Sequence, residues 1–349
     1  MSVINLLTDF EKRSTLPDSA ATTWWTSATF DVSIYEIWSA LLYGRTLHII
    51  PQEARPDPDQ VIESLAREEI HATYLPAFML PDLATALESG RLRFSALRRL
   101  LIGVEPIQEA LLGRILHHLP DLKIINGYGP AEATICCTLH DVTATADRII
   151  GRPVQNLTVY LLDAHGQPVP IGAPGEVYIG GVGLAEGYWN RPELNGTRFV
   201  PNPFSKQPDD DLYRTGDRAR YLPNGDLQFL GRVDAQLKIR GHRVEPGEIV
   251  AALESHPSVR RAAVRAWPPN RIAAYVSLLD ATEQEALREH LIAKLPRHMV
   301  PTQFVMLDTL PVNANGKVDV SALPEPKRQV SEKVAASATE VALVSIWSE

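Results

Sequence analysis

The segment that decides the fold is LRRLLIGVEPIQEALLGRILHHLPDLKIINGYGPAE, residues 97–132. Two short apolar runs, residues 97–103 and 122–126, flank a helical pattern, and a glycine-rich turn follows the second run. A strand, a crossover helix and a second strand predict parallel neighbours in a sheet. Ligands bind beyond the carboxyl ends of such strands, so residues 103–105 and 127–129 are the predicted site.

The same alternation extends upstream of this segment. Apolar runs at residues 47–50 and 71–75 are separated by a helical pattern whose start is marked by three residues. Asp57 is the predicted N-cap, Pro58 the first helical residue and Gln60 the return half of a capping box. The fold class is therefore α/β, with a parallel sheet and crossover helices.

Downstream, the sequence pattern changes twice. Residues 150–230 form short strands broken by glycine, proline and Asn-Gly, which predicts a small barrel or a distorted sheet. From residue 234 onward, a helix, two strands and a second helix capped by Thr282 predict a compact α+β unit. Residues 324–336 have the composition of a linker, and residues 339–347 begin an amphipathic helix.

Composition and charge exclude several function classes. The 349 residues, 45% of them hydrophobic, are enough for more than one domain. The chain has no apolar run of about 18 residues and no secretory signal, so we expect a cytoplasmic protein without a membrane partner. A net charge of −8 without a basic stripe argues against nucleic acid. The two cysteines, Cys136 and Cys137, are adjacent, where a disulfide would be strained, so a reducing compartment is expected.

Two motifs have the residue types of a nucleotide site. The turn at residues 126–132 combines glycines that let backbone approach a phosphate with Glu132, a carboxylate that can hold Mg²⁺. Ordinary loop geometry is the alternative. Residues 213–217 end in Asp217, an acceptor-only group suited to ribose hydroxyls, although a simple hairpin turn also explains this motif.

Three further motifs combine charge with an unusual setting. Asp31 lies in an apolar segment, where it either caps a helix or binds a cation such as an ammonium group. Lys317 follows an Asn-Gly turn and is either a point charge for a phosphate or ordinary surface. The basic run at residues 231–243 is a hinge or a solvated edge strand.

The order, spacing and flanking residues of these motifs resemble the adenylation domains of nonribosomal peptide synthetases, which are acyl-adenylate-forming enzymes. The likeness covers nearly all of residues 3–325, and residues 339–349 are similar to the opening helix of a peptidyl carrier domain. The segments that carry the resemblance are residues 30–33, 126–132, 175–181 with 187–188, 213–217, 231–247, 295–301 and 315–319.

The resemblance implies an adenylate-forming fold with a large subdomain at residues 1–232. Its parts would be a parallel-sheet αβα region (1–148) and a distorted β-barrel (149–232). A C-terminal α+β lid domain (233–323), a linker (324–337) and the start of a carrier-domain helix (338–349) would follow.

The resemblance also implies roles for single residues. Asp31 would pair with the substrate ammonium, Glu132 would bind Mg²⁺, and Asp234 would be the hinge of the lid. Lys317 would be the catalytic residue that reaches the substrate carboxylate and the α-phosphate. The nucleotide-binding residues, with Tyr128 stacked on adenine, would be Gly103, Val104, Glu105, Asn126, Gly127, Tyr128, Gly129, Asp217 and Arg232.

The implied substrate pocket is uncharged apart from its two end groups. A charged substrate side chain would lack a partner there, so we predict a neutral amino acid. The set is closest to pockets for aromatic amino acids of the phenylalanine or hydroxyphenylglycine type. Its residues are Asp31, Val32, Tyr35, Tyr74, Leu101, Gly103, Gly127, Ile135, Cys136 and Lys317.

The implied reaction is attack of the amino-acid carboxylate on the α-phosphorus of ATP with loss of pyrophosphate. Transfer to the phosphopantetheine thiol of a carrier domain would follow after the lid turns. ATP, Mg²⁺ and that carrier-bound phosphopantetheine would be the cofactors, and neighbouring synthetase domains the partners.

The sequence departs from the family at three places. A Gly/Ser/Thr-rich phosphate loop would precede residues 2–7, so we expect the isolated chain to lack the grip on pyrophosphate. Ala131 stands where the family usually has threonine, and Val104 where glycine is frequent. Two alternatives stay open: a non-catalytic nucleotide-binding remnant or scaffold, and an acyl-CoA synthetase-like ligase.

Overall fold

The computed structural model describes residues 1–103, 109–142, 148–207, 210–233, 237–239, 242–244, 246–267, 271–280, 282–311 and 318–326. The chain divides into two compact units, Met1–Arg243 and Val244–Glu349. The limit predicted at 232/233 precedes this division, and the domain limits taken from the sequence stay predictions.

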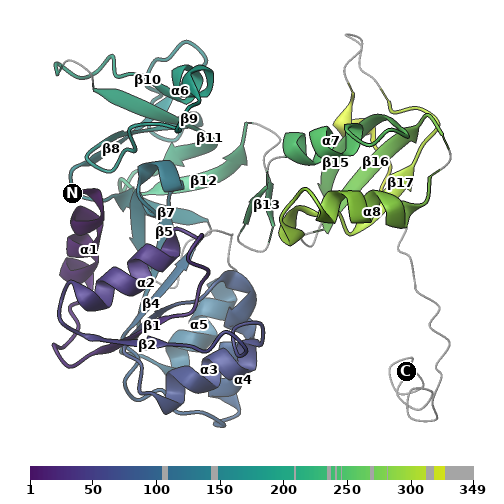
Figure 1. The fold of residues 1–349 in the computed structure, drawn as a ribbon. Coiled ribbons are helices and arrows are strands. Elements are labelled where there is room, and N and C mark those ends of the chain that lie inside the picture. The colour runs from purple at the N-terminus through teal and green to yellow at the C-terminus, as the bar shows by residue number, and fades with distance from the viewer. Residues whose placement is uncertain are drawn as a thin grey trace, which may run out of the picture. The chain divides into compact units, whose positions relative to one another are not determined.

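The first half of the larger unit is the predicted parallel sheet (Figure 1). Its strands lie in the order β2-β1-β3-β4-β5, each parallel to its neighbours. The strands predicted from apolar runs are confirmed. The first strand was not predicted because its buried positions include Thr22 and Thr23, which read as polar, and Thr23 bonds Thr73 of the next strand at 2.7 Å. The bounds are β1 (Ala21–Trp24), β2 (Thr46–Ile49), β3 (Ala72–Tyr74), β4 (Arg99–Gly103) and β5 (Lys123–Tyr128).

Helices connect these strands and pack around them (Figure 1). The predicted start of the third helix is confirmed in part: Asp57 accepts a hydrogen bond from the Asp59 amide at 3.0 Å, and Pro58 is the first helical residue. The capping box is wrong, because Gln60 bonds the Asp57 carboxylate and the Asp57 amide bonds Ala54. The bounds are α1 (Ser2–Arg13), α2 (Val32–Leu41), α3 (Pro58–Arg67), η1 (Ala77–Met79), α4 (Leu80–Glu88) and α5 (Glu109–His118).

The sheet continues without a break into an antiparallel half, in the order β5-β6-β7-β12-β11-β9-β8. The predicted distorted sheet of short strands is thus confirmed, with irregular register in the long central strand. The bounds are η2 (Ala131–Ala133), β6 (Thr138–Asp141), β7 (Ile149–Pro153), β8 (Leu157–Leu162), β9 (Gly175–Gly181), α6 (Pro192–Arg198), β10 (Phe199–Pro201), β11 (Asp211–Tyr221) and β12 (Leu227–Arg232).

The smaller unit is the predicted α+β arrangement, with strand order β15-β16-β17. Thr282 does not cap its second helix: the N-cap is Glu283, whose carbonyl accepts the Leu287 amide at 3.4 Å. The paired strands β13 (Leu237–Ile239) and β14 (His242–Val244) precede this unit's first helix. The bounds are α7 (Pro246–Glu254), β15 (Val259–Trp267), β16 (Arg271–Leu278), α8 (Gln284–Ile292), η3 (Arg297–Met299), β17 (Gln303–Met306) and η4 (Val320–Ala322).

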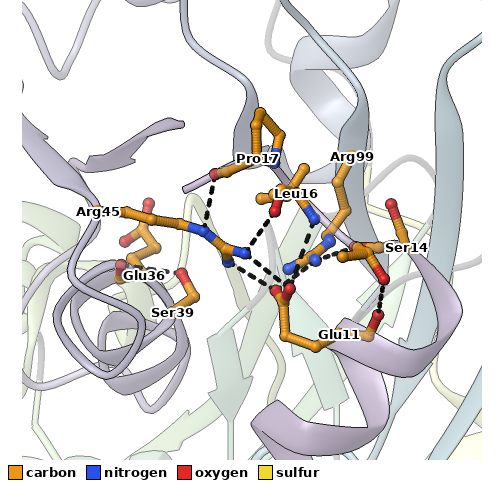
Figure 2. Close-up of polar contacts among 9 residues, drawn as sticks. Glu11, Ser14, Leu16, Pro17, Glu36, Ser39, Arg45 and Arg99 are labelled. Atoms are coloured by element: carbon orange, nitrogen blue, oxygen red, sulfur yellow. Dashed lines mark hydrogen bonds and ion pairs between the residues drawn. The ribbon is translucent and has the colours of Figure 1, made fainter. Parts of the chain in front are cut away.

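A shared carboxylate fastens the first helix to the sheet. Glu11 of α1 lies between the guanidinium groups of Arg45 and Arg99 (Figure 2). Arg45 donates twice, at 2.8 Å each, and Arg99 once, at 2.6 Å. Burial alone would raise the pKa of Glu11, but the hydrogen bonds from the two arginines outweigh burial and hold it below its ordinary value. This triad of Glu11, Arg45 and Arg99 therefore favours the charged form of the carboxylate.

Removing this carboxylate leaves two buried guanidinium groups without their counter-ion. We expect Glu11→Ala to lower the free energy of unfolding by about 3–5 kcal/mol, measured by urea denaturation at pH 7. Because the folded pKa is depressed, the stabilisation is present above the ordinary pKa of 4.5 and lost as pH falls through the folded value. Glu53→Ala, which removes an exposed acid, is the control. An equally small decrease in the free energy of unfolding in both variants would contradict the role of the triad.

Candidate active site

The carboxyl ends of β4 and β5 lie side by side, because Gly103 pairs with Gly127. A Cβ on Gly103 would lie 2.1 Å from the Gly127 carbonyl oxygen, and one on Gly127 would lie 2.5 Å from Cys136 Sγ. Gly103 also has a φ of +147°, which L side chains rarely adopt. Gly129 is equally tight, since its Cβ would lie 2.6 Å from the Cys137 nitrogen. The glycines are thus required for this close packing.

Asp217 of β11 is the centre of a buried polar network beside this turn. The Tyr128 hydroxyl donates to Asp217 Oδ2 at 2.6 Å, and Arg232 Nη1 donates to Oδ1 at 2.7 Å. Asp217 and Arg232 are opposite each other in the β11–β12 register. The Asp217 amide donates to Thr215 Oγ1 at 2.9 Å, which fixes the backbone at the same point. Three of the predicted nucleotide residues are therefore brought together.

The chemistry of this network suits a ligand with hydroxyl groups. Burial raises the pKa of Tyr128 well above its ordinary value, and the charge of Asp217 raises it further, so the hydroxyl stays a donor. A carboxylate offers about four lone-pair positions, more than the two side-chain donors use. Vicinal hydroxyls of a sugar are donors of the right kind. Asn126, by contrast, uses its side-chain amide to bond the Ile149 carbonyl at 2.8 Å.

Glu132 lies at the end of the same turn and is held by two tyrosines. The Tyr213 hydroxyl donates to Glu132 Oε1 at 2.8 Å, and the Tyr188 hydroxyl donates to the same oxygen. Burial raises the pKa of Tyr188, and the hydrogen bond to Glu132 raises it further. Neither tyrosine was assigned a role from the sequence, since the approach of residues 188 and 213 to residue 132 depends on the sheet.

A fixed carboxylate oxygen suits a hard cation such as Mg²⁺. Among the described residues, however, no group of three His, Cys, Asp or Glu side chains gathers around a common point. A cation at Glu132 would therefore take most of its ligands from water and from phosphate oxygens, as Mg²⁺ does at nucleotide sites.

The predicted pocket residues come from several elements and are mostly buried. Asp31 occupies the N-cap position of α2, but its side chain makes no capping hydrogen bond, so the helix-cap explanation for this acid is wrong. A Cβ on Gly127 would meet Leu101 and Cys136, which places these three together. The buried members are Val32, Tyr35, Tyr74, Leu101, Gly103, Gly127, Ile135 and Cys136.

Tyr74 has two aromatic neighbours: Phe30 of the motif at residues 30–33, and Trp25, which the sequence did not single out. Its ring centroid lies 6.4 Å from that of Trp25 and 6.1 Å from that of Phe30. The Trp25 indole donates to the Tyr74 carbonyl at 2.9 Å. Four predicted site residues, Val104, Glu105, Asp234 and Lys317, lie outside the described residues.

Comparison with known proteins places this geometry in a family. Residues 2–189 match the model of the AMP-binding enzyme family, and residues 248–317 match the AMP-binding enzyme C-terminal domain. The chain belongs to the AMP-binding enzymes. No helix among the described residues of this AMP-binding enzyme is long and apolar enough to cross a membrane.

The curated relatives are much longer than this chain. Tyrocidine synthase 3 of Brevibacillus parabrevis is 38% identical over 92% of the chain, which spans 5% of that relative. Gramicidin S synthase 2 of Aneurinibacillus migulanus is 37% identical over 91% of the chain, which spans 7% of it. Tyrocidine synthase 1 of Brevibacillus parabrevis is 37% identical over 92% of the chain, which spans 30% of it.

Solved structures confirm the adenylate-forming fold. PA1221, an NRPS protein containing adenylation and PCP domains, matches 87% of this AMP-binding enzyme and 53% of its own chain, with 29% identity and a TM-score of 0.74. The adenylation domain AlmE of Vibrio cholerae covers 92% of the chain and 61% of its own, with 23% identity and a TM-score of 0.79, and shows the fold alone.

Tyr128→Phe tests the network around Asp217. The change removes one donor from a buried carboxylate, and hydrogen bonds to charged groups are worth about 1.5–3 kcal/mol. We expect a loss of that size in the free energy of unfolding, measured by urea denaturation. Tyr160→Phe, which removes a hydroxyl from a partly exposed ring, is the matched control. Equal effects of the two variants would contradict the network.

Proposed function

We propose that this AMP-binding enzyme activates a neutral amino acid with ATP as its aminoacyl adenylate, for nonribosomal peptide synthesis. The observation that carries the proposal is the convergence of Tyr128 and Arg232 on the buried carboxylate of Asp217. The curated relatives, which are named as synthases of tyrocidine and gramicidin S, support the peptide-synthetic context.

In this proposal the network binds the nucleoside. Asp217 accepts hydrogen bonds from the ribose hydroxyls, while Arg232 balances the charge of the buried carboxylate. Tyr128 packs against the base. The glycines that end β4 and β5 let backbone amides approach the nucleotide without side-chain interference.

Glu132 holds the cation in this proposal. Its carboxylate fits the preference of Mg²⁺ for oxygen ligands, and Tyr188 and Tyr213 fix its orientation before the ion binds. Mg²⁺, when bound, supplies positive charge that offsets the charge developing on the phosphates. Lys317, proposed as the catalytic residue from the resemblance, adds a second positive charge at the reacting carboxylate and α-phosphate.

Asp31 determines that the substrate is an amino acid. A half-buried carboxylate at the start of α2, next in sequence to the buried Val32, attracts a positively charged group more strongly than it would in water. An α-ammonium group meets that requirement, whereas the carboxylic acids used by acyl-CoA synthetases lack it. Tyr35, Tyr74 and the other pocket residues favour a neutral, aromatic side chain.

Carrier-protein loading is the second step of the proposed function. The aminoacyl group moves from the adenylate to the thiol of phosphopantetheine on a peptidyl carrier domain, with Asp234 as the hinge of the lid. The PA1221 structure supports this partner, because that protein contains both adenylation and PCP domains. Neighbouring synthetase domains are the further partners, and the site of action is the cytoplasm.

Amino-acid-dependent ATP–pyrophosphate exchange tests the proposal. We expect exchange with one or a few neutral amino acids from a panel of the twenty proteinogenic ones plus 4-hydroxyphenylglycine. The assay is run in two forms, with this chain alone and with this chain joined to a Gly/Ser/Thr-rich phosphate loop of the family. No exchange in either form, from folded protein, would favour a non-catalytic nucleotide-binding remnant.

Asp31→Asn tests the assignment of the substrate ammonium. Losing a charge-assisted hydrogen bond worth about 1.5–3 kcal/mol should raise the KM for the amino acid roughly 10- to 100-fold. The KM for ATP should change less than about two-fold, because Asp31 has no proposed contact with the nucleotide. Asp18→Asn, an exposed acid, is the control. An unchanged amino-acid KM in Asp31→Asn would contradict the proposed contact of Asp31 with the substrate ammonium group.

A further inference from the structure

Glu36 is a buried acid that none of the assigned roles uses. It lies on α2 directly after Tyr35, with 1% of its surface exposed. Its Oε2 accepts a hydrogen bond from the Thr26 amide at 3.1 Å and also bonds the Thr26 hydroxyl. Its Oε1 is buried and has no hydrogen-bond partner within the described part of the chain. An ionised carboxylate with so few donors is costly, so the site favours the neutral acid.

Burial is the dominant influence on this side chain. It raises the pKa of Glu36 from its ordinary 4.5 to about 8, although hydrogen bonds from Thr26 and from the Trp25 backbone and the charge of Arg55 act in the opposite direction. At neutral pH the group is therefore mainly protonated.

The contact that Glu36 maintains spans the loop that carries Asp31. Thr26 is the second residue of the segment 25–31, which links β1 to α2 and ends at Asp31, the N-cap of that helix. Inside the segment, the Phe30 amide donates to the Ser27 carbonyl at 2.9 Å. The Glu36–Thr26 bonds therefore tie the beginning of the loop to the helix that follows its end.

The same contact borders the predicted substrate pocket. Trp25 precedes Thr26 and donates to the Tyr74 carbonyl at 2.9 Å, while Tyr35 precedes Glu36 on the helix. Movement of Thr26 would thus displace the pocket residues on β3 and α2 as well as the loop. Ser33 of α2 also bonds the loop, through a long 3.5 Å contact of its hydroxyl with the Ala28 carbonyl.

We propose that Glu36 is a positioning residue for substrate recognition: its buried carboxyl ties Thr26 to α2 and so holds the loop that presents Asp31 to the α-ammonium group. This inference rests on the proposed function, since it assigns Glu36 to the same amino-acid site. Glu36 touches neither the ammonium group nor the reacting atoms in this arrangement, and acts only through Thr26 and the loop.

The charged groups around α2 leave Glu36 without a close counter-ion. Arg55 acts on it from the segment after β2, but this arginine bonds the Ile50 carbonyl at 3.0 Å and lies over the Trp24 ring. Tyr74 is a further titratable group on β3. The charged side chains of α1 and β2 make other contacts, namely Asp9 with Arg13, Glu11 with Arg45 and Arg99, Lys12 with Gln155, and His48 with Glu68.

Ionisation should therefore loosen the loop. The ionised Oε1 needs water or another donor, and hydrating it requires the packing of α2 on β1 to open. Because the folded pKa is above the ordinary value, the unfolded chain releases this proton first. Stability thus falls as pH rises from about 4.5 to about 8, and the loss is complete above that window. Glu36→Gln removes this component, since a glutamine keeps an acceptor oxygen and never ionises.

Hydrogen exchange measured by mass spectrometry tests the loop directly. At pH 7 we expect Glu36→Ala to speed exchange of the amides in residues 26–31 by about 10-fold or more, and Glu36→Gln to stay within about three-fold of wild type. Glu53→Ala, an exposed acid, is the control. Above pH 8, after correction for intrinsic rates, exchange should accelerate in wild type and not in Glu36→Gln. Unchanged protection in Glu36→Ala would overturn the proposal.

Steady-state kinetics separate positioning from a general loss of structure. With the amino acid that supports the fastest ATP–pyrophosphate exchange, Glu36→Ala should raise the amino-acid KM about 10-fold or more and leave the ATP KM within about two-fold. Glu36→Gln should keep the amino-acid KM at its wild-type value. Above pH 8 the amino-acid KM should rise in wild type but not in Glu36→Gln. No exchange by the wild-type sequence in either form, alone or joined to the phosphate loop, would overturn the proposed function. An active wild type whose amino-acid KM is unaffected by Glu36→Ala would overturn the inference alone.

Discussion

The hydrogen bonds on the carboxylate of Asp217 connect the two halves of the large sheet at the site. Tyr128 comes from β5 of the parallel half, whereas Asp217 and Arg232 come from β11 and β12 of the antiparallel half. A buried carboxylate needs donors on its oxygens, and each half supplies one. The same two halves bring Tyr188 and Tyr213 to Glu132. Both acidic groups of the proposed nucleotide site thus depend on one continuous sheet.

The amino-acid side of the site depends on a different set of contacts. Asp31 is at the start of α2, and this helix packs on β1 and on α1. The first helix is in turn fastened through Glu11 to Arg99 of β4. Glu36 closes the loop between β1 and α2 through Thr26. Buried polar contacts of two carboxyl groups therefore position the substrate-binding acid Asp31. The Glu11 carboxyl is charged because it faces two guanidinium groups. The Glu36 carboxyl is mainly neutral because no guanidinium group lies close to it.

Local sequence signals predicted helices and strands better than they predicted contacts between side chains. The apolar runs and the Asp57-Pro58 helix start predicted β2 to β5 and α3, since burial and capping are local requirements. The threonine-rich β1 was missed because its polar side chains are satisfied by a neighbouring strand. Motif resemblance assigned Asp217, Tyr128 and Arg232 to one site; the structure shows these three side chains in contact, and their nucleotide-binding role stays a prediction. The partners of Glu132 and Glu36 could not be predicted, because they depend on sheet register and on burial, which spacing along the chain does not reveal.

The central claim is that the carboxylate of Asp217 is the ribose-binding group of an adenylate-forming site. A crystal structure of the chain with AMP bound tests it most directly. The account predicts ribose hydroxyls within hydrogen-bond distance of Asp217 and the base against Tyr128, with Arg232 still paired to the same carboxylate. AMP bound elsewhere, with Asp217 in contact only with Tyr128 and Arg232, would contradict it.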